Sequence, residues 1–492
     1  MFFLILSLVA LDPRYHTYQR MMQEIDSLAL LHTEIARVET VGVTAVNQLP
    51  IIAVKISDNP QMDEDEPALL FVGVHHAEEV LGCEVCIYTI EHLLEGYDND
   101  SLTTRLVDNL ELWFIPILNV DGHGIVTSGI DTTWRKNLRD NNDNGIFDPG
   151  YDGVDLNRNY GFNWEYGGSN DPSSEYYKGP APFSESETQV IRDLAQRERF
   201  LMAIDFHSAR TGQGEVIYYP WRWGANFCID YPFIRSIADS LAESILNDAG
   251  TGCYTAIYGV ATEGNFRNWL YATLGTYAYT VEISWGCTPP GYRVDDICQR
   301  VLDGLNVFMQ RATGPGVTIY VVDSISLLPL EAEVRVQNYY DPSLPPRTSD
   351  PVFGVFRKLL TPGVYSFEIM KDGYETTFVG NVNVVDTPVS VIVKMKPQSG
   401  VTEERHGRLM QVIPDYSSGV INFVAKVNES GNCTLQVFDS SGRLVTDVTR
   451  VSFADDRYVW HVPKNFSNGV YFAVFSKSGR TTCKRFLWLR SP

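Results

Sequence analysis

Residues 67–82 read PALLFVGVHHAEEVLG, and this stretch decides how the rest of the chain is interpreted. Residues 67–74 form a continuous apolar run, which is typical of a strand buried on both faces of a sheet. From Glu79 to Tyr97, apolar side chains follow at the spacing of a helix. Two histidines and two glutamates therefore lie between a predicted strand and a predicted helix, where α/β sheets bind their ligands.

These four residues allow two overlapping His-x-x-Glu pairs, His75 with Glu78 and His76 with Glu79. Either pair can bind one metal ion from a single turn of chain. A catalytic zinc site needs three protein ligands and an open fourth position for water, so one pair is incomplete. His207, at the carboxyl end of another apolar run, is a candidate third ligand. The spacing by itself leaves the choice between the two pairs open.

Strands and helices alternate along the first three fifths of the chain, from about Tyr15 to Ala312. Apolar runs predict further buried strands at 110–120, 201–208 and 276–284, and helical spacing predicts helices at 18–38, 183–198 and 298–312. This alternation predicts an α/β sheet with helices on both faces.

The composition changes at residues 312–316, ATGPG. Beyond them, short alternating runs broken by Pro and Gly predict two all-β sandwiches. We therefore expect a large α/β domain and two small sandwiches with a polar linker between them, with boundaries at 13–314, 315–397, 398–408 and 409–492.

Charge and the N-terminal residues limit the partners of the chain. The 492 residues carry 61 Asp and Glu against 39 Lys and Arg, a formal net charge of -22. This excess repels phosphates, so we expect no nucleic-acid partner. The apolar run from Phe2 to Leu11 has the length of a signal-peptide core and is too short to span a bilayer. We expect export, with residues 1–12 as the signal peptide, and no membrane-spanning segment.

The eight cysteines permit disulfides in an exported protein. Cys83 and Cys86 form a C-x-x-C that lacks a second pair, which makes it a weak zinc or redox signal. Cys433 and Cys483 lie in short predicted strands of the last sandwich, and they are the pair to test first.

Further polar residues fit the chemistry of acyl transfer. Glu282 lies inside the apolar run 276–284, and because a buried unpaired carboxylate is costly, it is either paired or kept for use; we favour use. Arg135 and Arg158, with Asn157 beside it, offer cations for a carboxylate or for a developing oxyanion.

In this order, HHAEE, WRK, GVDLNRNY, FHS, IYGVATEGNFRNW and YTVEIS resemble the zinc metallocarboxypeptidases, the family of carboxypeptidases A, B and T. The resemblance runs from about Tyr15 to Ala312 and implies a mixed, twisted sheet with helices on both faces. The family motif His-Ala-x-Glu matches residues 76–79. The resemblance therefore implies that one zinc ion is bound by His76, Glu79 and His207.

The same resemblance implies the roles of the other residues. Glu282 takes the place of the general base, and Arg135 that of the arginine that polarises the scissile carbonyl. Asn157 and Arg158 match the pair that binds the terminal carboxylate, and Tyr258 matches the mobile tyrosine that closes over the substrate. Together they imply a secreted zinc carboxypeptidase that hydrolyses the last peptide bond of peptides or proteins.

The specificity pocket falls near GNFRNW and is left open by the sequence. If Arg267 points into the pocket, acidic C-terminal residues would be preferred; if Phe266 does, the preference is apolar. If Arg267 instead lies on the surface, it has no influence on which C-terminal residue is preferred. Glu78 stands where carboxypeptidases A and B usually have arginine, which removes a cation from the outer substrate subsites.

A separate stretch, RDNNDNGIFDPGYDG, follows the spacing of a calcium loop. The candidate oxygen ligands are Asp140, Asn142, Asn144 and Asp148, with Gly145 at the turn. Tyr151 stands at position twelve in place of glutamate, which excludes a full EF-hand. Calcium binding, which some bacterial members of the family show, and a polar turn without an ion both remain open.

The tail also resembles known modules. The first sandwich looks like the transthyretin-like domain that follows some carboxypeptidases, and the second is similar to the C-terminal sorting domains of type IX secreted bacterial proteins. These likenesses imply a secreted or cell-surface bacterial protein whose tail meets secretion machinery; we expect a monomer. Two alternatives stay open: a carboxypeptidase acting on peptidoglycan stem peptides, and a catalytically inert surface adhesion protein.

Overall fold

The computed structural model describes residues 11–209 and 213–398, and beyond them the strand segments 410–415, 420–425, 433–439, 444–451, 457–462, 469–477 and 480–488. Contacts divide the chain into two units. The first comprises Met1–Pro60, Pro67–Gly314 and Ser343–Pro345, and the second comprises Gln61–Glu66, Pro315–Pro342 and Pro346–Pro492. Most of the predicted signal peptide and of the predicted linker lies outside the described residues.

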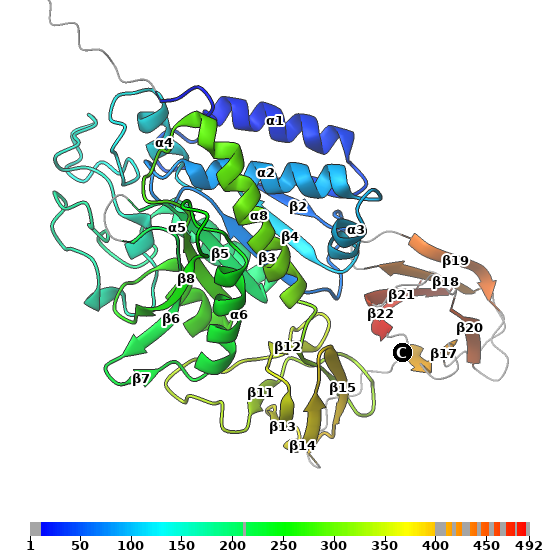
Figure 1. The fold of residues 1–492 in the computed structure, drawn as a ribbon. Helices are drawn as coiled ribbons and strands as arrows, with labels where there is room; N and C mark the ends of the chain where they lie inside the picture. The colour runs from blue at the N-terminus through cyan, green and yellow to red at the C-terminus, as the bar shows by residue number, and fades with distance from the viewer. Residues whose placement is uncertain are drawn as a thin grey trace, which may run out of the picture. The chain divides into compact units, whose positions relative to one another are not determined.

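The first unit is built on a nine-stranded sheet (Figure 1). Its strands are β1 (Ala36–Val43), β2 (Pro50–Ile56), β3 (Ala68–Val72), β4 (Glu111–Ile115), β5 (Met202–His207), β6 (Val216–Trp223), β7 (Asn226–Phe227), β8 (Thr255–Val260) and β9 (Tyr277–Glu282). The order is β1-β2-β4-β3-β5-β9-β6-β7, with β8 beside β6. Strands β4, β3, β5 and β9 are parallel, whereas β1, β2 and β6 pair antiparallel with their neighbours in that order. The prediction of a mixed sheet is confirmed.

Among its described residues, this unit has the α-helices α1 (Tyr18–Leu31), α2 (Leu81–Gly96), α3 (Ser101–Val107), α4 (Val120–Thr127), α5 (Ser186–Glu198), α6 (Tyr231–Glu243), α7 (Phe266–Trp269) and α8 (Val294–Arg311). The helix predicted over 18–38 is shorter than expected. It ends at Leu31, and β1 begins at Ala36. The residues after Leu31 are rich in β-branched side chains, which favour a strand.

Neighbouring residues of β4 show that helices cover both faces of the sheet. The ring of Phe114 stacks on Phe71 of β3 at 4.8 Å, and Phe71 contacts Phe308 of α8 at 6.2 Å. Trp113 points to the opposite face, because side chains alternate along a strand, and Arg197 of α5 lies over its ring at 5.6 Å. Helices α8 and α5 therefore lie on opposite faces, as predicted.

The second unit is all-β in its described parts. Its first strands are β10 (Gly316–Asp323), β11 (Glu333–Val336), β12 (Val355–Leu359), β13 (Gly363–Met370), β14 (Thr377–Val384) and β15 (Pro388–Met395), in the sheets β12-β10-β15 and β11-β13-β14. Ile319 and Val321 of β10 are buried at alternate positions, as are Phe367 and Ile369 of β13. This alternation is the pattern of sheets that enclose a core between them.

The last strands are β16 (Met410–Asp415), β17 (Val420–Ala425), β18 (Cys433–Asp439), β19 (Leu444–Val451), β20 (Arg457–His461), β21 (Gly469–Lys477) and β22 (Arg480–Trp488). Their sheets are β16-β17-β20 and β19-β18-β21-β22. The side chains of Cys433 and Cys483 lie outside the described residues, but β21 separates their strands. Two strand spacings are about 10 Å, beyond the reach of a disulfide, so the strand order speaks against that pairing.

Cys83 and Cys86 are free thiols, both buried in α2. None of the helices in the described part of the chain is long and apolar enough to cross a membrane.

Candidate active site

A cavity of about 310 Å³ lies where the carboxyl ends of β5 and β9 meet the HHAEE turn. It is lined by all the residues predicted as zinc ligands, general base and substrate contacts: His76, Glu79, Arg135, Asn157, Arg158, His207, Tyr258, Arg267 and Glu282. The tertiary structure thus brings together residues that are up to about two hundred positions apart in the sequence.

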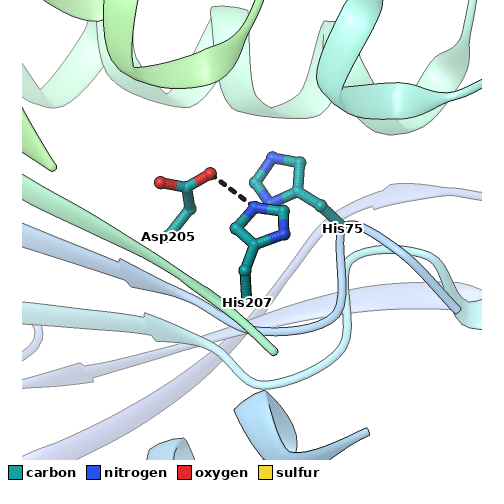
Figure 2. A group of neighbouring side chains, drawn as sticks. All are labelled: His75, Asp205 and His207. Carbon is teal, nitrogen blue, oxygen red and sulfur yellow. Dashed lines mark hydrogen bonds and ion pairs between the residues drawn. The ribbon is translucent and has the colours of Figure 1, made fainter. Parts of the chain in front are cut away.

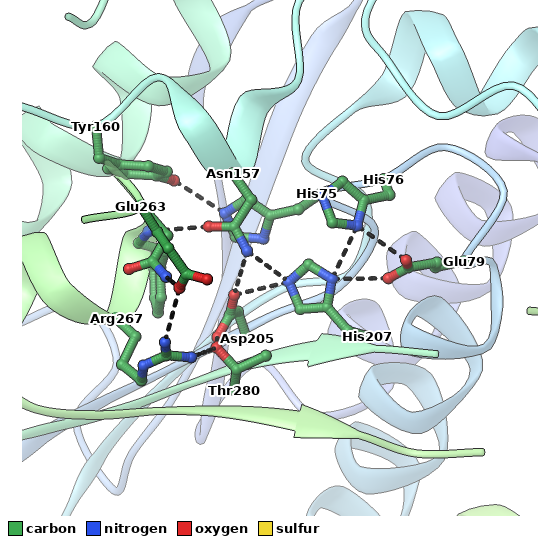
Figure 3. A network of polar contacts seen from close by, with 12 residues as sticks. His75, His76, Glu79, Asn157, Tyr160, Asp205, His207, Glu263, Arg267 and Thr280 are labelled. Carbon is green, nitrogen blue, oxygen red and sulfur yellow. Dashed lines mark hydrogen bonds and ion pairs between the residues drawn. The ribbon is translucent and has the colours of Figure 1, made fainter. Parts of the chain in front are cut away.

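Three side chains converge within this cavity in the manner of metal ligands (Figure 3). His207 Nδ1 lies 3.0 Å from His76 Nδ1 and 2.7 Å from Glu79 Oε2, and His76 Nδ1 lies 2.9 Å from Glu79 Oε1. Two nitrogens bound to one tetrahedral zinc ion at their usual distance are about 3.3 Å apart. The spacing of these ligand atoms therefore fits a single zinc ion.

Buried carboxylates fix which ring nitrogen of each histidine faces that point. His76 Nε2 lies 3.2 Å from Asp155 Oδ1, and His207 Nε2 lies 2.8 Å from Asp205 Oδ2. Each Nε2 therefore carries the proton that it donates to its carboxylate, which leaves the Nδ1 lone pair for a metal. Two nitrogens and one carboxylate with such support are a donor set that zinc accepts.

His75 belongs to a second group of potential ligands, with Asp205 and His207 (Figure 2). It is fully buried, its Nε2 lies 2.9 Å from the hydroxyl of Tyr160, and burial lowers its pKa to about 3. Neither His75 nor Asp205 lines the cavity, and His207 would have to give up its bond to Asp205 to bind a metal through Nε2. The geometry therefore favours His76 with Glu79.

The backbone before the two histidines forms a tightly constrained turn. Val74 has a φ of 56°, a left-handed conformation that costs a β-branched residue about 1–3 kcal/mol. Hydrogen bonds from Asn119 N to Val74 O and from Leu118 N to Gly73 O hold the turn in place, at 3.0 and 3.1 Å. A Cβ at Gly73 would lie 2.4 Å from Pro116 O, so only glycine fits there.

Glu78, the other half of the pair with His75, is buried and does not line the cavity. Its Oε1 lies 4.0 Å from Arg135 Nη1. Glu78 therefore adds negative charge beside Arg135 and does not stand on the rim of the site.

Arg135 is held mainly by Asp155. Its Nε and Nη2 donate to Asp155 Oδ2 at 3.1 and 3.0 Å, and its Nη1 lies 3.5 Å from Glu79 Oε1. Burial lowers the pKa of Arg135, but the charges of Asp155 and Glu79 outweigh it and raise the pKa above its usual value. Arg135 is a fixed cation beside the converging ligands.

Glu282 lies at the end of β9, paired in register with His207. Burial, and then the negative charge of Glu79, raise its pKa to about 7. A carboxyl group whose pKa lies near neutral is suited to accept and return a proton.

The residues predicted to bind substrate differ in the contacts that their polar groups already make within the protein. Asn157 is built into the wall, since its Nδ2 donates to Asp205 Oδ2 at 3.2 Å and its Oδ1 accepts from Phe266 N at 2.9 Å. The ring of Tyr176 lies over Arg158 at 5.8 Å and over Arg135 at 5.4 Å. These contacts fix both guanidinium groups at one wall of the cavity.

Tyr258 and Arg267 also line the cavity. Tyr258 is 40% exposed, and its hydroxyl accepts a hydrogen bond from Arg222 Nη1 at 3.1 Å. Arg267 is buried at the cavity wall, whereas Phe266 is fully buried against His75 and does not line the cavity. Of these two residues, only Arg267 can meet a ligand in the cavity.

The predicted calcium loop is not supported. Asp140 Oδ1 accepts from the backbone N–H groups of Asn142 and Asn144, and its Oδ2 accepts from Gly145 N at 2.7 Å. The side-chain oxygens of Asn142, Asn144 and Asp148 also accept backbone N–H groups of this loop. The oxygens therefore accept hydrogen bonds from the loop's own amides.

Sequence reasoning missed the two carboxylates behind the histidines, Asp155 and Asp205. Asp155 precedes the Leu-Asn-Arg of a quoted motif, and Asp205 lies in the apolar run 201–208 two residues before His207. The signal that singled out Glu282, a carboxylate within an apolar strand, would have found Asp205 as well.

Comparison with known proteins identifies the family. The family model described as zinc carboxypeptidase matches residues 21–301. The chain belongs to the zinc carboxypeptidase family. It is 26% identical over 313 residues to carboxypeptidase B from Astacus astacus, covering 60% of this chain and 95% of that protein. Its fold is similar to the crystal structure of carboxypeptidase A from Helicoverpa armigera, with a TM-score of 0.53 and 24% identity over 61% of this chain and 73% of that chain.

One relative of this chain has the word inactive in its name. The inactive metallocarboxypeptidase ecm14 from Schizosaccharomyces pombe is 30% identical over 212 residues, which cover 40% of this chain and 41% of that protein. Membership of the family therefore does not by itself imply catalysis.

Proposed function

We propose that this zinc carboxypeptidase family member is an active, secreted enzyme that removes C-terminal residues from peptides or proteins. The observation that carries the proposal is the convergence of His76 Nδ1, His207 Nδ1 and the Glu79 carboxylate in a cavity that also holds Glu282 and Arg135. An inert relative would be expected to have lost part of such a set.

His76, Glu79 and His207 would hold the metal, with Asp155 and Asp205 fixing the two rings. When bound, zinc polarises a water and lowers the pKa of that water toward about 7. Glu282 would accept a proton from the attacking water as the oxygen of that water forms a bond to the last peptide carbonyl carbon. Glu282 then returns the proton to the leaving amine as the C–N bond breaks.

Arg135 stabilises the negative charge that develops on the carbonyl oxygen during this attack. Its guanidinium is already oriented by Asp155, so little reorganisation is needed as the charge forms. The Tyr176 ring restricts it from the other side.

Arg158 makes the enzyme an exopeptidase, because an internal peptide bond offers no carboxylate to pair with a guanidinium. Asn157 supports Arg158, whose Nη1 donates to Asn157 O at 2.8 Å. Tyr258, exposed at the mouth of the cavity, closes over the bound substrate.

The C-terminal side chain preferred by the enzyme is acidic. The support for this preference is Arg267, a guanidinium that is 3% exposed and lines the cavity. A buried guanidinium forms charge-assisted hydrogen bonds with a carboxylate side chain, which an apolar side chain cannot make.

We also propose export from a bacterial cell. The apolar run from Phe2 to Leu11 and the likeness of residues 409–492 to sorting domains support it. Cell fractionation and the N-terminal mass of the mature protein provide the test. A cytoplasmic protein that retains residues 1–12 would contradict export.

A peptide panel tests the enzymatic proposal. Peptides that differ in their C-terminal residue, together with a muropeptide, are incubated with the protein, with and without a zinc chelator. We expect chelator-sensitive release of single C-terminal residues, fastest for glutamate and aspartate. Glu282→Gln should lower the rate by about 10²–10⁴-fold while zinc stays bound.

The other outcomes of the panel have distinct meanings. Turnover of the muropeptide alone would favour peptidoglycan stem peptides as substrates. A zinc-loaded protein that cleaves none of the peptides would contradict the enzymatic proposal. It would favour an inert binding protein.

A further inference from the structure

A carboxylate of the chain itself lies against Arg267. Glu263 Oε2 accepts a hydrogen bond from Arg267 Nη2 at 3.2 Å, and Asn265 Nδ2 donates to the same oxygen at 2.7 Å (Figure 3). The Glu263 side chain is 28% exposed against 4% for Arg267, and both residues line the cavity. Glu263 therefore reaches Arg267 from the solvent side of the pocket.

The guanidinium of Arg267 is also held from within the sheet. Its Nη1 donates to Thr280 Oγ1 at 2.9 Å, and Thr280 Oγ1 donates to Asp205 Oδ1 at 2.7 Å. The backbone at Gly259 leaves the room that the guanidinium occupies, since a Cβ there would lie 2.1 Å from Arg267 Nη2. Arg267 is therefore held from inside the sheet, whereas the Glu263 side chain is partly exposed to solvent.

On one edge of the Arg267 guanidinium, only one of the two N–H donors has a hydrogen-bond partner among the described residues. This edge carries Nε and Nη2: Nη2 donates to Glu263, whereas Nε is buried and has no hydrogen-bond partner among the described residues. Carboxylates bind arginine most strongly through two parallel N–H donors of one edge. An incoming carboxylate that takes both donors would replace Glu263, which uses one.

We propose that Glu263 is a specificity-determining residue, an internal competitor that occupies Arg267 in the free enzyme and is displaced by the acidic side chain of the substrate's C-terminal residue. This inference rests on the proposed carboxypeptidase function and deepens it. Glu263 lowers the affinity of the pocket for acidic residues. Glu263 also compensates the charge of Arg267 when a neutral C-terminal residue is bound. It therefore reduces the difference in affinity between substrates with acidic and with neutral C-terminal residues.

Glu263→Gln tests the competition, because glutamine keeps the acceptor for Asn265 and Arg267 and removes only the charge. The matched control is Glu165→Gln, an exposed glutamate outside the cavity lining, on the turn whose Gly167 packs against the Glu263 backbone. kcat/KM is measured on two peptides that differ only in a C-terminal glutamate or leucine. We expect Glu263→Gln to raise the glutamate-to-leucine ratio roughly three- to tenfold, mainly through KM, and Glu165→Gln to leave it unchanged.

A binding measurement separates this proposal from catalysis. In zinc-loaded Glu282→Gln protein, calorimetry with the same two peptides should show that Glu263→Gln tightens binding of the glutamate peptide by a similar factor and leaves the leucine peptide unchanged. Glu263→Asp, with a shorter side chain, should fall between wild type and Glu263→Gln.

Three results would overturn the competition. Equal effects of Glu263→Gln on both peptides would mean that the charge of Glu263 acts on any bound peptide. Weaker binding of the glutamate peptide would make it a support that Arg267 needs. A wild-type preference for C-terminal lysine or arginine that Glu263→Gln abolishes would mean that Glu263 binds the substrate itself. Failure of the proposed function would look different, because the wild-type enzyme would then release no residue from either peptide.

Discussion

His207 and Glu282 are register partners at the carboxyl ends of the adjacent parallel strands β5 and β9. Partners in register project to the same face of a sheet, so strand pairing sets the third metal ligand and the proposed base side by side. A base that is carried by a rigid strand keeps its position better than one on a loop. This arrangement makes the effects of substitutions in the site predictable.

Substituting the two adjacent histidines separately should give opposite results. His76→Gln removes a converging Nδ1 and should abolish stoichiometric zinc binding. His75→Gln removes a buried ring that contacts Tyr160, so it should lower stability by about 1–3 kcal/mol and leave zinc bound. Zinc content by mass spectrometry and unfolding by denaturant measure the two effects. Zinc loss in His75→Gln alone would transfer the ligand role to His75.

Removing the charge of Asp205, which contacts His207 Nε2, should weaken zinc binding without removing a zinc ligand. Asp205→Asn loses the carboxylate that accepts the proton of His207 Nε2, and such partners contribute about 10–100-fold to metal affinity. Competition with a chelating dye gives the zinc Kd. Asp239→Asn, on the exposed face of α6, is the matched control. An unchanged Kd in Asp205→Asn would refute the supporting role.

Arg135→Lys should lower kcat about 10²–10³-fold with little change in KM, because lysine keeps a charge but cannot make the two bonds to Asp155 that orient the guanidinium. Steady-state kinetics on the preferred peptide provide the measurement. Arg139→Lys, on the same loop and paired with Glu185, should remain close to wild type. A rise in KM alone would assign Arg135 to substrate binding.

Glu282 should destabilise the metal-free protein at high pH. Burial and Glu79 raise its folded-state pKa to about 7, above the value of about 4.3 in an unfolded chain. Between these values the folded state binds the proton more tightly, so stability falls as the pH rises and the full penalty is present above pH 7. Glu282→Gln should therefore raise the free energy of unfolding by roughly 1–3 kcal/mol at pH 8.

Denaturant unfolding of chelator-treated protein at pH 4.5 and pH 8 checks this prediction. The gain in Glu282→Gln should largely disappear at pH 4.5, where the carboxyl is protonated in the folded state and partly protonated in the unfolded chain. An equal gain at both values would mean that the substitution acts through packing and not through charge.

The local sequence pattern was sufficient to predict the strands that carry the residues of the site. The apolar runs predicted β3, β5 and β9, and the residues at or just after their carboxyl ends include His76, His207 and Glu282. A continuous apolar run is decisive because a strand buried on both faces needs it along its whole length. The mixed order of the sheet came from the family resemblance, since strand order depends on connections that local pattern does not contain.

The sequence by itself determined the residue types available for zinc, acid–base chemistry and carboxylate binding, because each is present as a side chain in a motif. Only the tertiary structure decided between His75 and His76, which have the same spacing to a glutamate and differ in which ring lines the cavity. It also placed Glu263 against Arg267, and it directed the calcium-loop oxygens to the loop's own amides. Such contacts depend on side-chain direction and burial, which arise only when distant parts of the chain pack together.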